Sequence, residues 1–153
     1  MEMPKPSVGH QMFEKLAGSW DGKERLYPSP WDPAGGAARG RMKARVDLNG
    51  FALIIDYEQE RDGAVTFRGH GVLTFNPKNE IYTLTWFDCM GSPAEVFRGR
   101  FENEILQVAH GGPGMHARLS YDLREAGYLS KTMELSQDGN TWSRFFDGRL
   151  KRL

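Results

Sequence analysis

The sequence predicts an all-β fold, namely an up-and-down antiparallel barrel of about ten strands preceded by one short helix. From Gly18 onward, apolar and polar residues alternate with the period of two that is typical of half-buried strands. Asn-Gly and Asp-Gly pairs interrupt this alternation at the spacing of roughly 8–12 residues that is common in all-β proteins. An open sheet of about ten strands would leave two long edges exposed, so we expect the sheet to close.

The N-terminal segment differs from the rest of the chain. Residues 1–9 contain two prolines and few apolar side chains, so we expect a flexible leader before a single domain at 10–153. Met12, Phe13 and Leu16 then follow at helical spacing, and this spacing predicts a short helix over 10–16 that Gly18 ends.

Short turns predict that neighbouring strands pair antiparallel. The expected strands cover 18–27, 38–48, 51–60, 64–75, 80–88, 94–101, 104–110, 115–124, 127–137 and 140–151. Three connections, at 28–37, 89–93 and 110–114, are longer and rich in glycine and proline. Because turns alternate between the two ends of a meander, the 28–37 connection and the 61–63 turn should share one end of the barrel.

Composition narrows the classes of partner and location. The chain of 153 residues carries 20 basic and 20 acidic residues, which argues against a nucleic-acid or acidic-membrane partner because both attract clustered positive charge. Cys89 is the single cysteine, and we find neither a signal peptide nor an apolar run of the roughly 20 residues that span a bilayer. We therefore expect a cytoplasmic protein.

Gly18-Ser19-Trp20 follows the expected helix and opens the first strand. This placement, with an arginine late in the final strand, resembles the calycin superfamily of lipocalins and fatty-acid-binding proteins. The resemblance implies that Trp20 plugs one barrel end and that Arg149 or Arg152 stacks over it. Gly148 has no side chain, so we expect it to lie opposite the Trp20 indole.

The chain as a whole is most similar to DUF1579, a bacterial family of unknown function. The similar segments are Leu16-Ala-Gly-Ser-Trp-Asp-Gly22, Leu48-Asn-Gly-Phe51, Gly69-His-Gly71, Trp86-Phe-Asp88 and Ser136-Gln-Asp-Gly-Asn-Thr-Trp142. The resemblance implies a lipocalin-like barrel and identifies no catalytic residues.

Placing the apolar face of each strand inward puts several polar side chains at or near the lumen. They are Glu24, Tyr57, Tyr121, Lys131 and Arg144. Charges inside a barrel require partners or water, so they favour a water-containing cavity whose polar side chains can bind a ligand. The alternative is that some strands have reversed faces or that the charges only compensate one another. A register with Trp20 opposite Gly148 would place Glu24 beside Arg144.

Three further residues are candidates for the lumen and its rim. Trp31 lies in the 28–37 loop that we expect over the open end, and His70 lies between two glycines on a strand. Trp86 lies on a strand with apolar residues on both faces. We expect the outward one either to form a homodimer contact or to be covered by the N-terminal helix.

No motif for catalysis or for a metal is evident. The chain has no Gly-x-Ser-x-Gly motif, Cys89 has no adjacent histidine, and no third ligand accompanies His110 and His116. We expect no catalytic residues, metal or cofactor. The sequence favours binding of a small apolar or amphipathic molecule without chemistry. The alternatives are an isomerase or hydrolase that uses the interior charges, a haem or metal protein, and a structural module with a filled lumen.

Overall fold

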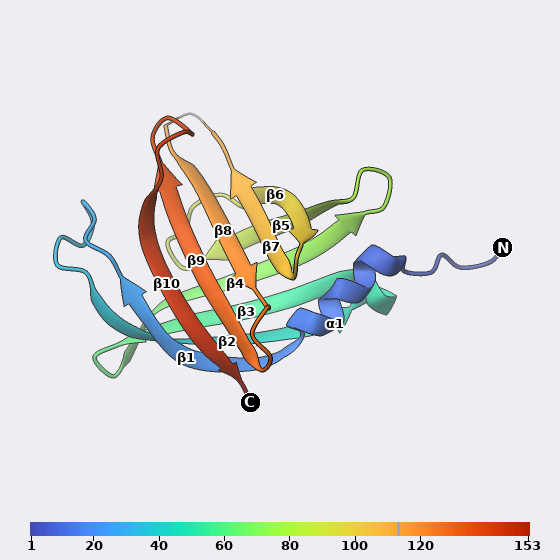
Figure 1. Cartoon of the computed structure of the whole chain (residues 1–153), viewed down its shortest axis with the longest axis horizontal. Coiled ribbons are helices and arrows are strands. Elements are labelled where there is room, and N and C mark those ends of the chain that lie inside the picture. Colours follow the sequence, from blue (N-terminus) through green and yellow to red (C-terminus); the bar gives the residue numbers. More distant parts are fainter. Residues whose placement is uncertain (113) are drawn as a thin grey trace.

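The computed structural model describes residues 1–112 and 114–153, which form a closed antiparallel barrel of ten strands (Figure 1). Each strand pairs with its neighbours in the sequence, and the first strand pairs with the last. The expected fold is therefore confirmed, including closure through the two end strands.

The elements differ from the expected ranges by a few residues at their ends. They are η1 (Val8–Gln11), α1 (Met12–Leu16), β1 (Gly18–Leu26), β2 (Gly36–Asp47), η2 (Leu48–Gly50), β3 (Ala52–Arg61), β4 (Ala64–Asn76), β5 (Ile81–Asp88), β6 (Glu95–Glu102), β7 (Ile105–His110), β8 (His116–Asp122), β9 (Tyr128–Ser136) and β10 (Ser143–Arg152). Pro113, in the expected 110–114 connection, lies outside the described residues. The last strand starts three residues later than expected because the Asp138 carboxylate accepts from the backbone N–H groups of Asn140 and Thr141, each at 2.8 Å. These bonds hold the turn and lower the pKa of Asp138 to about 2.

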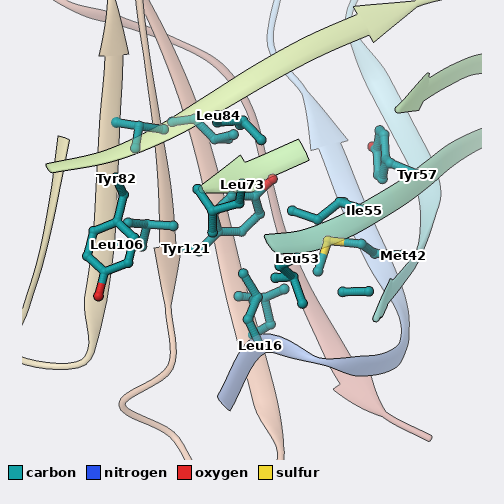
Figure 2. Close-up of a cluster of buried hydrophobic side chains, with 14 of the residues drawn as sticks. Leu16, Met42, Leu53, Ile55, Tyr57, Leu73, Tyr82, Leu84, Leu106 and Tyr121 are labelled. Carbon is teal, nitrogen blue, oxygen red and sulfur yellow. The ribbon is translucent and has the colours of Figure 1, made fainter. Parts of the chain in front are cut away.

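α1 covers one end of the barrel, and a cavity lies at the opposite end, which we call the open end or mouth. Met12, Phe13 and Leu16 of α1 are buried, as their spacing predicts, and join a core with Leu53 and other inward side chains (Figure 2). β1 runs from this end to the opposite one.

At the open end, the loop after β1 meets the turn between β3 and β4. Arg61 Nη1 donates to Asp32 Oδ2 at 2.6 Å, and Arg61 Nη2 donates to the Gly35 carbonyl at 3.0 Å. The prediction that these two connections share one end is confirmed.

Trp20 packs between the helix and the final strand, as the calycin resemblance implies. Its side chain is buried, and its Nε1 donates to the Leu16 carbonyl at 2.9 Å. The Arg152 guanidinium lies 4.2 Å from the centre of the indole and donates to the carbonyls of Ala17 and Lys15 at 2.5 and 2.7 Å. Arg152 therefore links the plug to the C-terminal end of α1.

Two details of the expected plug were wrong. Trp20 pairs with Arg152, and Gly148 pairs instead with Glu24, so the register differs by four residues from the expected one. Arg149 points outward, because it is one residue out of phase with the buried Leu150, and it forms an ion pair with Glu125.

On β5, Tyr82, Leu84 and Trp86 form the inner face, which the sequence left open. Gly69 and Gly71 make room for the Trp86 indole: a Cβ atom on Gly69 would lie 2.0 Å from Trp86 Cζ2. The outer face carries Ile81, Thr83, Thr85 and the half-exposed Phe87.

His10 is a buried titratable group beside the helix. Its ring lies edge-on to those of Phe13, Phe51 and Phe75, and the Ser7 N–H donates to its Nδ1 at 3.0 Å. Burial lowers the pKa of His10 below its usual value, although a backbone hydrogen bond to Phe75 opposes the change.

We expect Trp20→Ala to lower the free energy of unfolding by about 3–5 kcal/mol, because it removes a buried indole, its hydrogen bond and its stacking partner. Urea unfolding followed by circular dichroism measures the loss. Trp31→Ala is the matched control, because Trp31 is 66% exposed and should cost less than about 1 kcal/mol. Equal losses in the two variants would contradict the plug.

We expect the protein to lose stability on acidification through His10. Because the pKa of His10 is lower in the folded chain than in the unfolded one, the unfolded chain takes up the proton first as pH falls. This contribution is complete above the unfolded value of about 6.5 and is lost as pH falls from there toward the folded value. Denaturant titrations at several pH values should give a shallower pH dependence for His10→Gln than for the native chain. Identical pH dependences would contradict the assignment.

Candidate functional site

Four polar side chains meet inside the barrel, and we call them the inner polar cluster. They are Glu24 from β1, Tyr57 and Gln59 from β3, and Lys131 from β9. Glu24 and Lys131 are each 3% exposed, so an acid and a base are almost fully withdrawn from water. Tyr121, from β8, is also buried nearby.

Two glycines give the Glu24 carboxylate its space. A Cβ atom on Gly40 would lie 2.4 Å from Glu24 Cδ, and one on Gly148 would lie 2.6 Å from Glu24 Cγ. Such distances are far shorter than a van der Waals contact. Side chains at these positions of β2 and β10 would therefore displace the carboxylate.

The cluster is organised around Glu24. The Tyr57 hydroxyl and Gln59 Nε2 both donate to Glu24 Oε1, the latter at 3.1 Å, and Gln59 Nε2 also lies 3.0 Å from Tyr57 Oη. Lys131 Nζ donates to Glu24 Oε2 at 3.5 Å and lies 3.5 Å from the centre of the Tyr57 ring. The aromatic face and the carboxylate together stabilise the ammonium group.

Burial shifts the titration of the cluster. Removal from water lowers the pKa of Lys131, while the Glu24 carboxylate opposes this change. Burial, and then the charge of Glu24, raise the pKa values of Tyr57 and Tyr121 above their usual range. Both tyrosines therefore keep their hydroxyl protons at neutral pH, and Tyr57 remains a donor to Glu24.

A cavity of about 250 Å³ opens at the barrel mouth and reaches the cluster through Gln59. Its other lining residues include Leu26, Trp31, Arg61, Phe67 and Phe145. Trp31 is largely exposed and lies edge-on to Phe145, with 6.0 Å between the ring centres. Two larger hollows, of about 750 and 720 Å³, lie over the outer face of β5–β7 and beside α1, and the inner polar cluster lines neither.

Two of the predicted site residues lie elsewhere. Arg144 is half exposed and pairs with Asp147 at 3.1 Å, so the expected Glu24–Arg144 pair was wrong. The β1–β10 register and a bulge between Arg144 and Phe146 remove it from Glu24. His70 faces outward and contacts Asp56 at 2.8 Å, because its neighbours on β4, Gly69 and Gly71, occupy the inner face.

Sequence reasoning missed Gln59 and the Arg61–Asp32 pair. Gln59 follows Tyr57 by two residues on one strand, so the same alternation that placed Tyr57 inward also predicts Gln59 there. The Arg61–Asp32 pair depends on the conformation of the loop after β1. The sequence predicted only that this loop and the turn between β3 and β4 lie at the same end of the barrel.

The ionisable groups of the cluster are occupied by one another. A buried amine with a lowered pKa beside a carboxylate is a combination found in general acid–base sites. Here, however, the carboxylate and the amine are bonded to each other and to Tyr57 and Gln59. Within residues 1–112 and 114–153, no group of three or more His, Cys, Asp or Glu side chains is placed to hold a metal ion.

We expect Lys131→Met to lower the free energy of unfolding by about 3–5 kcal/mol, because it leaves the Glu24 carboxylate buried without its counter-charge. The double variant Glu24→Gln with Lys131→Met should recover part of this loss, because no uncompensated charge remains. Chemical denaturation of the three proteins measures both effects.

Glu134→Gln is the matched control, because Glu134 pairs with Arg118 on the outer face of the same β8–β9 region. It should cost at most about 1 kcal/mol. A Lys131→Met protein as stable as the native chain would contradict the stabilising role of the Glu24–Lys131 ion pair.

Comparison with known proteins agrees with the barrel. The crystal structure of Rv2717c from M. tuberculosis is similar, with a TM-score of 0.74 and 14% sequence identity over 96% of this chain and 98% of that one. At this identity the likeness concerns the fold alone. The sequence matches no curated protein. In the described part of the chain, no helix has the length and apolarity to cross a membrane.

The family model described as "Protein of unknown function (DUF1579)" matches residues 5–152. This match covers nearly the whole chain and includes both the plug and the inner polar cluster. The chain therefore belongs to the DUF1579 family.

Proposed function

We propose that this barrel binds a small, largely apolar molecule at its open end, with the inner polar cluster as the anchor for a polar group. The observation that carries the proposal is the cavity itself, in which aromatic and apolar side chains share the lining with polar ones, Gln59 of the cluster among them. A concave site that combines aromatic and apolar side chains with polar groups able to orient a ligand is typical of small-molecule binding.

The two halves of the barrel differ in how far their inward side chains are buried. Near α1, Leu53, Leu73 and Leu106 are fully buried, as expected for a filled interior. Toward the mouth, Phe67 and Trp86 are only partly buried although they lie on the inner face. The cavity beside Phe67 supports a ligand site in this half rather than a filled structural module.

The cavity also limits the size of the ligand. Its volume of about 250 Å³ lies just under the range of roughly 300–1,000 Å³ that is usual for ligand pockets. A ligand whose enclosed part has one or two rings, or is a short alkyl chain, fits this space. Trp31 and Phe145 at the mouth can contact the part of a ligand that extends outward.

The neutral fluorescent probe N-phenyl-1-naphthylamine tests the site, because its emission increases in apolar surroundings. We expect saturable binding to the native protein. Phe67→Asp should weaken the affinity about tenfold or more, since it places a charge in the apolar wall.

Phe87→Asp is the matched control, because Phe87 lies on the outer face of β5 and is 47% exposed. Its affinity should stay within about twofold of the native value. Absence of saturable binding to the native protein, or equal weakening by both substitutions, would contradict the proposed site.

A further inference from the structure

We infer that the polar group of the ligand is uncharged and donates a hydrogen bond, as a hydroxyl or an amide does, and that the site selects against carboxylates. The inference rests on the proposed function and concerns the chemical class of its ligand. It follows from the charge balance around the cavity and from the orientation of the Gln59 side chain.

The charges around the cavity are already paired. Among the described residues that line it, Arg61 is the one cation and Asp32 the one anion, and they contact each other at 2.6 Å. Beneath them, Lys131 is paired with Glu24. A carboxylate ligand would have to displace Asp32 or Glu24 from its partner or be buried without a counter-charge, and both are costly.

Gln59 determines which hydrogen-bonding group of the inner polar cluster is left for a ligand. Its Nε2 contacts Glu24 Oε1 and Tyr57 Oη, and both oxygens accept there, because the Tyr57 proton is donated to Glu24. The amide orientation is thereby determined, since an oxygen in the place of Nε2 would face two acceptors.

Gln59 Oε1 is consequently turned away from these partners, and no described residue donates to it. Because Gln59 lines the cavity, this oxygen is the acceptor that the inner polar cluster offers to a ligand. A hydroxyl or an amide N–H can donate to it. An ionised carboxylate cannot, because it is only an acceptor.

The experiment uses three ligands with the same eight-carbon chain: 1-octanol, octanamide and octanoate. Displacement of N-phenyl-1-naphthylamine at pH 7.5 gives their relative affinities. We expect octanol and octanamide to bind the native protein at least about tenfold more tightly than octanoate. Equal or tighter binding of octanoate would overturn the inference.

Variants that unbalance the charges should change this preference. Glu24→Gln leaves Lys131 without its counter-charge, so the affinity for octanoate relative to octanol should rise at least about tenfold. Asp32→Asn frees Arg61 at the mouth and should change the ratio in the same direction, which keeps the test valid if Glu24→Gln folds poorly. Glu134→Gln, on the outer face, should leave the ratio unchanged.

The outcomes separate the two proposals. If the probe binds but none of the three ligands displaces it, or if neither charge variant changes the ratio, this inference is wrong and the cavity remains a binding site. If neither the probe nor any of the three ligands binds, the proposed function itself is wrong.

Discussion

Arg152 stacks on Trp20 and donates to the carbonyls of Lys15 and Ala17 at the end of α1, and these contacts join the helix, the first strand and the last strand. The contact between Arg152 and Trp20 forms in the β1–β10 register that pairs Trp20 with Arg152 and Glu24 with Gly148. Residues deeper in the barrel depend on this register. A change of two positions along β10 would keep the same faces but would place Leu150 or Phe146 beside Glu24, where Gly148 now leaves room for the carboxylate.

The packing of side chains beneath α1 allows the interior at the opposite end of the barrel to be less completely filled. Side chains from α1 and from the adjacent halves of the strands fill the interior, so the stability of the barrel does not require a filled mouth. The inward aromatic residues near the mouth remain partly accessible, and the inner polar cluster lies where the filled part ends. The proposed ligand site depends on this difference between the packed end and the end that carries the cavity.

The ion pair of Glu24 and Lys131 is a costly feature to keep inside a barrel. Desolvation of two charges often exceeds the attraction between them, and apolar residues of similar volume are commonly as stabilising. Stability alone therefore does not account for the pair. Its position beneath a cavity, with Gln59 between the two, gives it a role in holding the Gln59 amide in one orientation.

The sequence by itself determined the barrel and the inner face of β1, β3, β8 and β9, because alternation with a period of two acts along a single strand and needs no knowledge of its neighbours. Glu24, Tyr57, Tyr121 and Lys131 were placed inside on this basis, and Gln59 follows from the same rule. Register between strands depends on packing across the barrel, so only the tertiary structure decided that Arg152, not Arg149, covers Trp20. The same holds for Arg144, which a bulge and a register difference of four residues remove from Glu24. The partner of Glu24 is Lys131, more than a hundred positions away in the chain, because contacts inside a closed barrel depend on how strands curve around it rather than on local pattern.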